Sequence, residues 1–438
     1  MPHDAKDLRA LLQQRLPTYA LGPALLSLAI GLWGIDKVGL WDDERHTLFA
    51  IPQILWRLWE APLIPYYASM WIWTGGGAVS SDAWLRFSSV LAMTGAVFLT
   101  SVTAKRLGGR RVGLLAGLIL TLMPSVTRYA QEARVYAFAT LLAALATWLV
   151  VRGAQGGGRR WWVAYALTLV TIGVLAPFGY AIVPAHGFLI LQKSEWRPHL
   201  RAWAVAGLTN IPILIIAALL SARFGPNLRD WLAKPTLTNL VTDIPDIAGT
   251  LAVGVVLVAL SIATRTGTQW LVATAIGMAA LWLVSIGPAS FWLTRSFLPL
   301  APVLAVAASF VAVKLSLPRF LTLTALLGLL VWPSLQADRQ PGSRGLDPRQ
   351  LAGLVDSRAE AGDVVNTAIS DWLAWGVSRY SSQPDVYQYG PSSTGRAWVL
   401  DKDVPCVRLE EYTVPGGDSL LVLCQQLPEG WENRVVRN

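Results

Sequence analysis

Residues 84–127 read WLRFSSVLAMTGAVFLTSVTAKRLGGRRVGLLAGLILTLMPSVT, two apolar runs separated by a short basic turn. Each run approaches the roughly 20 residues that a helix needs to cross the hydrocarbon core of a bilayer. The turn carries Lys105, Arg106, Arg110 and Arg111, and such clusters are typical of cytoplasmic loops between membrane spans. The stretch therefore predicts a transmembrane helical hairpin whose turn faces the cytoplasm.

The whole chain has the same character. Of 438 residues, 54% are apolar and 14% are charged, whereas an average soluble protein has about 25% charged residues. We count about eleven candidate spans, near residues 18–40, 84–104, 112–127, 135–151, 161–176, 178–192, 202–220, 246–263, 270–286, 296–313 and 320–336. No basic start with a small-residue cleavage site precedes the first span, so we expect this span to be retained. The expected fold is a polytopic α-helical membrane protein.

Lysine and arginine gather in alternate loops, which predicts the orientation. The basic loops include those at residues 105–111, 152–160 and 193–201, and we assign them to the cytoplasm together with the N-terminus. With an odd number of spans, the C-terminus then lies outside the plasma (inner) membrane. Because no basic stripe is interleaved with aromatic side chains, we expect membrane lipids as partners and no nucleic acid.

The chain changes composition after the last span. Residues 1–336 form the expected membrane domain and residues 337–438 a separate one, and the polar linker QADRQPGSRGLDPRQ at residues 336–350 lies at the boundary. Short strand-like runs such as DVVNTAI and LLVLCQQL follow, separated by turn-forming residues, and predict a small extracytoplasmic α/β domain. Cys406 and Cys424 both lie there, where an oxidising environment favours a disulfide. The alternative is a pair of buried free thiols.

The first outer loop, residues 41–83, begins within the sequence GLWDDERHTLFA at residues 39–50, which directly follows the first apolar run. Consecutive carboxylates close to hydrocarbon are costly, so they need either water or a function. The same loop contains many tryptophan and tyrosine side chains, which suit helices lying in the membrane interface. Such helices would enclose a cavity beside the bilayer. The structural alternative is that the acidic cluster caps the first helix or holds interfacial water.

The second outer turn reads PSVTRYAQEARVYAF at residues 124–138, with four polar side chains between two apolar runs. If the turn is helical, Arg128 and Glu132 are four residues apart, and the simplest interpretation is a local ion pair. That pair leaves Arg134 unexplained, because Arg134 would share another helix face with Gln131.

Several stretches together resemble the GT-C class of membrane glycosyltransferases. They are LWDDERHTLFA, APLIPYYASMWIW, the run from residue 81 through QEARVYAF, and TRSFLPLAPVLAVAAS near residue 300. The similarity is to the family-39-like group, which includes protein mannosyltransferases and the lipid A aminoarabinose transferase. It extends over roughly residues 35–150 and returns near residues 290–310.

The resemblance implies site residues where the motifs match. The family's catalytic carboxylate falls on Asp43, followed by Glu44, and the motifs QEARVY and TRSFLPLAP nominate Arg134 and Arg295 as ligands of a donor phosphate. The same match places Glu132 and Tyr136 near the cavity, and we also expect Asp42, His46, Tyr66, Tyr67, Arg128 and Gln131 to line it. One feature departs from the family pattern, because Ala61–Tyr67 lacks the histidine that often precedes the two tyrosines.

The predicted topology limits the chemistry independently. Sugar nucleotides are made in the cytoplasm, so carboxylates outside require a sugar already carried across on a lipid, such as a polyprenyl-phosphate sugar. Its phosphate leaves with negative charge that arginines stabilise, and the acceptor hydroxyl requires a general base. A single displacement inverts the anomeric centre. No cofactor is expected, and a divalent metal on Asp43, Glu44 and His46 is a less favoured alternative. Asp42 is an alternative general base.

Two other classes of protein are weaker alternatives. A transporter or lipid-sugar flippase places ionisable groups near the membrane midplane and often has two similar halves, whereas the polar groups here flank the spans. An anchored scaffold needs far fewer spans. Within a span, His186 is interpreted as a packed, hydrogen-bonded residue. The sequence identifies neither the sugar, with mannose and a pentose such as arabinose favoured, nor the acceptor, which is a glycolipid, a cell-wall glycan or a protein.

Overall fold

The computed structural model describes residues 18–56, 63–224, 232, 234–287, 290–345, 347–358, 360, 364–366, 376–382, 396–400, 407–413 and 420–425. The chain divides into two compact units. Unit 1 comprises Met1–Trp33, Ile54–Trp73 and Arg86–Pro333, and unit 2 comprises Gly34–Gln53, Thr74–Leu85 and Ser334–Asn438. The C-terminal part of the chain therefore groups with two segments that include the two ends of the predicted first outer loop.

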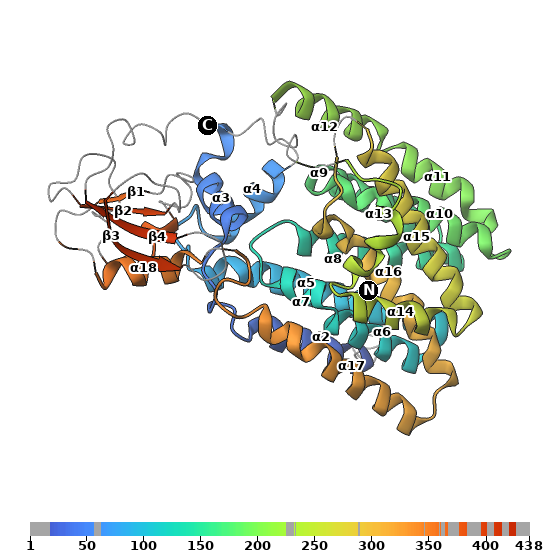
Figure 1. The fold of residues 1–438 in the computed structure, drawn as a ribbon. Helices are drawn as coiled ribbons and strands as arrows, with labels where there is room; N and C mark the ends of the chain where they lie inside the picture. The colour runs from blue at the N-terminus through green and yellow to red at the C-terminus, as the bar shows by residue number, and fades with distance from the viewer. Residues whose placement is uncertain are drawn as a thin grey trace, which may run out of the picture. The chain divides into compact units, whose positions relative to one another are not determined.

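Unit 1 is built from helices (Figure 1). They are α2 (Thr18–Leu32), α4 (Ile64–Trp73), most of α5 (Asp82–Gly108), α6 (Arg110–Leu122), α7 (Pro124–Ala130), α8 (Tyr136–Arg152), α9 (Arg159–Leu175), α10 (Ile182–Gln192), α11 (Leu200–Leu208), α12 (Ile211–Phe224), α13 (Asn239–Thr242), α14 (Leu251–Ile262), α15 (Arg265–Ser285), α16 (Ala301–Ser309) and most of α17 (Leu317–Ala337). Short 3-10 turns adjoin several of them, among them η4 (Pro177–Ala181), η6 (Ile244–Ile247) and η7 (Thr294–Leu300).

Local sequence explains how the predicted hairpin folds. Gly109 separates α5 from α6 with φ +90°, a conformation that glycine adopts without steric cost. Met123 is extended because it precedes Pro124, and the chain bends by 64° between α6 and α7. Further along, Thr250 and Thr264 cap α14 and α15 by accepting hydrogen bonds from backbone N–H groups. The predicted hairpin is therefore present as α5, α6 and α7.

Each predicted apolar segment coincides with one helix or with a pair of consecutive helices. Within the described residues, however, six helices are long and apolar enough to span a membrane, or seven if the bent pair of α6 and α7 counts as one span. The expected number of eleven spans is therefore not confirmed. The difference arises because several segments, such as α2 and α14, form helices shorter than a bilayer requires.

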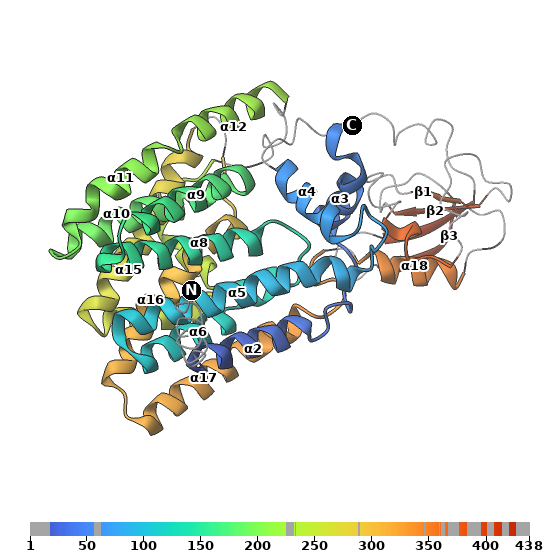
Figure 2. The ribbon, with the colours of Figure 1, turned by 180° about the vertical axis from the view of Figure 1, so that it is seen from behind.

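Helix α16 forms the centre of unit 1. All nine of its residues are buried, and it packs against α6, α14 and α15 (Figure 1). Around it, α2 and α17 lie side by side in both views, and Trp33 stacks on Trp332 with ring centroids 5.5 Å apart (Figure 2). The outer helices expose large apolar side chains, such as Leu219 on α12 and Leu329 on α17. An apolar core with an apolar exterior is the arrangement that a bilayer requires.

Unit 2 contains two short helices and a small sheet. The helices are α3 (Asp42–Ala50) and α18 (Pro348–Asp356), and α18 begins where the Asp347 side chain accepts a hydrogen bond from the Arg349 N–H at 2.9 Å. The strands are β1 (Val364–Asn366), β2 (Arg396–Leu400), β3 (Val407–Thr413) and β4 (Leu420–Gln425), in the order β1-β2-β4-β3. β1 is parallel to β2, and the other two pairs are antiparallel.

Candidate functional site

The three consecutive carboxylates form the first turn of α3, where negative charge interacts favourably with the helix dipole. They differ in burial. The Asp42 side chain is 72% exposed and pairs with Arg45, Asp43 is half-buried, and the Glu44 side chain is 0% exposed. The predicted catalytic Asp43 and the alternative base Asp42 therefore have different surroundings.

Glu44 has its partners inside unit 2. Its carboxylate accepts a hydrogen bond from the backbone N–H of Trp41 at 3.4 Å, which caps its own helix. It also pairs with Arg344 across 3.7 Å, and the arginine side chain is only 3% exposed. The alternative interpretation, in which the acidic cluster caps a helix, therefore holds for Glu44. The helix that Glu44 caps is α3, and not the first apolar helix.

Arg45 and His46 complete the same turn. Arg45 is buried, donates to the Leu40 carbonyl at 2.8 Å and pairs with Asp42. Burial lowers the pKa of Arg45, and the neighbouring Asp42 opposes that shift. His46 is half-buried one residue further on. Among the described residues, no group of three or more histidine, cysteine or acidic side chains is arranged to hold a metal ion.

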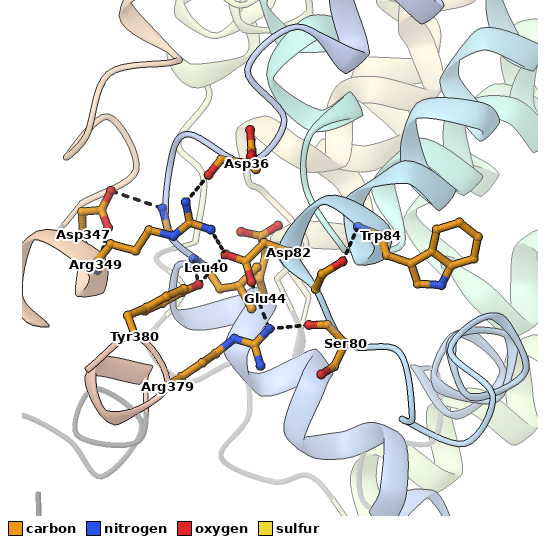
Figure 3. A network of polar contacts seen from close by, with 12 residues as sticks. Asp36, Leu40, Glu44, Ser80, Asp82, Trp84, Asp347, Arg349, Arg379 and Tyr380 are labelled. Carbon is orange, nitrogen blue, oxygen red and sulfur yellow. Dashed lines mark hydrogen bonds and ion pairs between the residues drawn. The ribbon is translucent and has the colours of Figure 1, made fainter. Parts of the chain in front are cut away.

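A second carboxylate of unit 2, Asp82, lies at the start of α5 and is buried (Figure 3). Arg349 donates to one of its oxygens at 2.7 Å and Arg379 donates to the other at 3.1 Å. The Tyr380 hydroxyl also donates to Asp82, at 2.6 Å. Burial, followed by the negative charge of Asp82, raises the pKa of Tyr380 to about 12. Asp82 thus joins the start of α5 to residues near position 380.

The polar turn of unit 1, residues 131–135, connects α7 to α8. α7 ends at Ala130 and α8 begins at Tyr136, so Gln131 and Arg134 lie between the helices and do not share a helix face. The buried Gln131 amide donates to the carbonyls of Gly31 and Trp33, both at 2.9 Å, and so satisfies the end of α2.

The charged side chains of this turn are mostly buried. Arg128 and Glu132 form the predicted local ion pair, with 3.7 Å between Nε and Oε1, and Glu132 is completely buried. Arg134 is buried within the same turn, and its N–H bonds the Glu132 carbonyl at 2.8 Å. Glu132 and Arg134 therefore both lie in the short segment between α7 and α8.

Arg295 and Tyr136 lie together in unit 1, although they are far apart in the sequence. The Arg295 guanidinium lies over the Tyr136 ring, 5.6 Å from its centroid, and η7, which carries Arg295, packs against α8. Tyr136 also packs edge-on against Tyr129, with centroids 5.5 Å apart, and tilts against Phe178 at 6.1 Å. The two motifs that the resemblance singled out thus meet at the start of α8.

The tyrosine pair of the first outer loop reaches the same helix. Tyr66 and Tyr67 lie on α4 and are buried. The Tyr66 ring packs edge-on against Phe138 of α8, with centroids 5.8 Å apart. Three predicted segments, around residues 66, 136 and 295, therefore converge in unit 1. Residues 57–62, which include part of the predicted interfacial segment, lie outside the described residues.

His186, the two cysteines and a cavity belong to other parts of the chain. His186 is completely buried and hydrogen-bonded to Thr147 at 3.0 Å and Tyr165 at 3.1 Å, which confirms its interpretation as a packed residue. Cys406 lies outside the described residues, so its disulfide with Cys424 stays a prediction. A cavity of about 470 Å³ is lined by other residues, namely Arg106, Leu107, Ala154, Gln155, Gly156, Lys193, Glu195, Trp196 and His199.

Sequence reasoning missed the partners of the two buried carboxylates. Arg344 and Arg349 lie in the stretch interpreted as a polar linker, and Arg379 and Tyr380 lie in a region expected only to form a small domain. Asp82 was visible as an acidic residue directly before an apolar run, which is a helix-start signal. Its arginine partners give no such local signal.

Comparisons with known proteins agree with this fold. Residues 61–221 match the family model described as dolichyl-phosphate-mannose-protein mannosyltransferase. ArnT from Cupriavidus metallidurans in the apo state has a similar structure, with a TM-score of 0.59 at 12% identity, covering 94% of this chain and 99% of that chain. The structure of the same protein bound to undecaprenyl phosphate matches with a TM-score of 0.54, at the same identity and coverage. No curated protein matches the sequence.

The resemblance inferred from sequence motifs is therefore confirmed. The chain has the fold of ArnT over most of its length, and its residues 61–221 are similar to the protein mannosyltransferases of the GT-C class. That matched range includes Tyr66, Arg134 and Tyr136.

Proposed function

We propose that this protein is a membrane glycosyltransferase that uses a polyprenyl-phosphate-linked sugar. In this proposal it transfers the sugar, mannose or a pentose such as arabinose, to a hydroxyl group on a glycolipid, a cell-wall glycan or a protein. The reaction takes place on the outer face of the plasma membrane, inverts the anomeric centre and requires no cofactor. The N-terminus is cytoplasmic, and the C-terminal domain is extracytoplasmic.

The observation that carries the proposal is the meeting of three motifs in unit 1. Arg295 lies over the ring of Tyr136, and Tyr66 packs on Phe138 two residues further along α8. Arginine beside aromatic rings suits an anionic group attached to a sugar, because the guanidinium binds phosphate oxygens and rings pack on apolar sugar faces. Helix packing alone does not require an arginine at this position.

Polyprenyl phosphate is the donor class that best fits the fold. The similar ArnT structure holds undecaprenyl phosphate. A lipid-linked donor also supplies an activated sugar to an enzyme whose carboxylates lie outside the membrane. In the proposed site, Arg134 and Arg295 bind the donor phosphate and stabilise its charge as the glycosidic bond breaks.

Asp43 is the proposed general base. It accepts the proton of the acceptor hydroxyl while that oxygen forms a bond to the anomeric carbon, and the bond from that carbon to the phosphate oxygen breaks. The electron pair leaves with the polyprenyl phosphate. Asp43 is favoured because it occupies the position that matches the catalytic carboxylate of the resembled family. Asp42 pairs with Arg45, and Glu44 is buried and pairs with Arg344. Glu44, first nominated together with Asp43, is accordingly proposed to support the helix.

The first experiment identifies the donor. The purified full-length protein is incubated with membrane lipid extract and with each of several undecaprenyl-phosphate sugars, and the loss of lipid-linked sugar is followed. We expect one donor to be consumed and free undecaprenyl phosphate to accumulate. A panel in which no donor loses its sugar contradicts the proposal. A sugar that stays on its lipid but changes leaflet in proteoliposomes supports the flippase alternative.

The second experiment assigns the residues. Asp43→Asn keeps the size of the side chain and removes its basicity, so turnover should fall at least about 100-fold while donor binding is retained. Asp42→Asn is the matched control and should have a mild effect. Near-normal turnover by the Asp43→Asn enzyme contradicts the assignment, and an inactive Asp42→Asn enzyme moves the base to Asp42.

Arg295→Met tests the phosphate site. A hydrogen bond to a charged group contributes about 1.5–3 kcal/mol, so donor affinity should fall about 10- to 100-fold. Turnover should fall as well, because the same charge acts during bond cleavage. Arg319→Met is the control, since Arg319 is exposed on α17. Equal donor affinities for the two variants contradict a phosphate role for Arg295.

A further inference from the structure

The chain segment that leads into α3 is bound by residues from the C-terminal part of unit 2 (Figure 3). The Gly39 N–H donates to the Asp347 carboxylate at 3.2 Å, and Arg349 donates to the Asp36 carbonyl. Gly39 also lies so close to Asp347 that an added Cβ would meet its carboxylate oxygen at 2.5 Å. Residues separated by 308 positions in the sequence are thus in direct contact.

Tyr380 contacts the same segment at Leu40. Its hydroxyl accepts a hydrogen bond from the Leu40 N–H at 3.0 Å and donates one to Asp82 at 2.6 Å. Asp82 is itself held by Arg349 and Arg379, so the tyrosine hydroxyl is fixed on a buried carboxylate with two arginine partners. The backbone at Leu40 is therefore attached to a rigid point three residues before Asp43.

The other end of the Leu40 peptide is also bound. Its carbonyl accepts a hydrogen bond from Arg45 at 2.8 Å, and Arg45 pairs with Asp42. The N–H and the carbonyl of Leu40 therefore both have side-chain partners, one from the C-terminal segment and one from α3. A nine-residue helix frays most easily at its ends, and these contacts oppose fraying in the turn that carries Asp43.

We propose that Tyr380 is a positioning residue for Asp43. It acts through Leu40: held by Asp82, its hydroxyl fixes the backbone that enters α3, and this sets where the Asp43 carboxylate lies. The C-terminal segment thereby contributes to the reaction without touching the substrate. This inference rests on the proposed function, in which Asp43 is the general base.

Tyr380→Phe in the full-length protein tests the inference, because it removes only the hydroxyl. We expect kcat to fall at least about tenfold, since displacing a reacting group by about 1 Å can cost about 100-fold in rate. The KM for the lipid-linked donor should stay within about twofold, because the donor phosphate is bound elsewhere. The acidic limb of the pH profile of kcat/KM should shift, because the surroundings of the base change.

Tyr412→Phe is the matched control, since Tyr412 lies on β3 of the same unit and packs under Arg358 through its ring. Its kinetics and pH profile should match those of the wild type. Gly39→Ala disturbs the same segment through Asp347 without removing a polar group, and should reproduce the split between kcat and KM seen for Tyr380→Phe.

The outcomes separate this inference from the proposed function. If Asp43→Asn is inactive while Tyr380→Phe and Gly39→Ala both behave like Tyr412→Phe, the positioning role is refuted and the base assignment stands. If Asp43→Asn remains active, the base assignment fails whatever the other variants do. A Tyr380→Phe enzyme whose activity falls only in proportion to its folded fraction, with an unshifted pH profile, also refutes the positioning role.

Discussion

The buried pair of Glu44 and Arg344 gives the sharpest prediction about stability, and Arg344→Met is the perturbation. Methionine fills a similar volume but carries no charge, so it leaves the Glu44 carboxylate buried without its arginine. Asp43 is unchanged in this variant. Any loosening of α3 therefore comes from its support and not from its proposed base.

The magnitude follows from the geometry of the pair. At an effective dielectric constant of about 20, unit charges 3.7 Å apart attract each other by about 4 kcal/mol. In the intact pair, the free energy needed to remove both charges from water offsets much of this attraction. When one partner is removed, the desolvation cost of the remaining charge is no longer compensated. For a buried pair that penalty is about 3–5 kcal/mol. We expect local opening of α3 to become easier by about 3 kcal/mol, which is about a 100-fold change in equilibrium constant.

Hydrogen exchange of peptides covering α3 measures this opening directly. Arg344→Met should accelerate exchange in α3 about 100-fold at constant pH, whereas peptides covering the buried α16 should exchange as in the wild type. The double variant Glu44→Gln with Arg344→Met should recover most of the protection, because it removes both charges and keeps an acceptor for Trp41. Wild-type exchange in Arg344→Met, or a double variant that loses the sum of the two single effects, refutes the reasoning.

The remaining predictions concern other parts of the chain. Because the pKa of Tyr380 is raised from 10.0 to about 12, its contribution to stability is complete below pH 10 and is lost between pH 10 and 12, so alkaline unfolding should begin at higher pH in Tyr380→Phe. Gln131→Ala should cost about 1–3 kcal/mol, seen as a lower Tm in detergent, because the buried Gly31 carbonyl and the partly buried Trp33 carbonyl lose their donor. Without reductant, Cys406 and Cys424 should resist alkylation after denaturation. A C-terminal tag should label from outside, and a tag in residues 106–111 should not.

The helices of unit 1 could be predicted because their signals are local. Apolar runs, the basic turn at residues 105–111 and the Met123-Pro124 step all act on neighbouring residues, and α5, α6 and α7 lie where these signals indicate. The number of membrane-spanning helices could not be predicted as well. Hydropathy finds apolar segments, but neighbouring helices decide where each one bends or ends, as at Gln131.

The contacts of the candidate site also differ in how far the sequence predicted them. The juxtaposition of Tyr136 and Arg295 followed from motifs whose order resembles a known class. The support of α3 did not, because its decisive contacts join residues about 300 positions apart, such as Asp82 with Tyr380. Arginines in a polar stretch have the same local appearance whether they are solvated or buried against a carboxylate. Only the folded chain distinguishes the two cases.

The run of three carboxylates illustrates how one helix turn separates the roles of adjacent, similar residues. Successive side chains on an α-helix point about 100° apart, so three neighbours necessarily face three directions. Glu44 faces the interior, where Arg344 and the Trp41 N–H neutralise it, and Asp42 faces outward and is bound to Arg45. Asp43 has the remaining direction and intermediate burial. The two flanking carboxylates hold the turn in place, and the proposed base is the central residue because Asp43 is the position that matches the catalytic carboxylate of the resembled family.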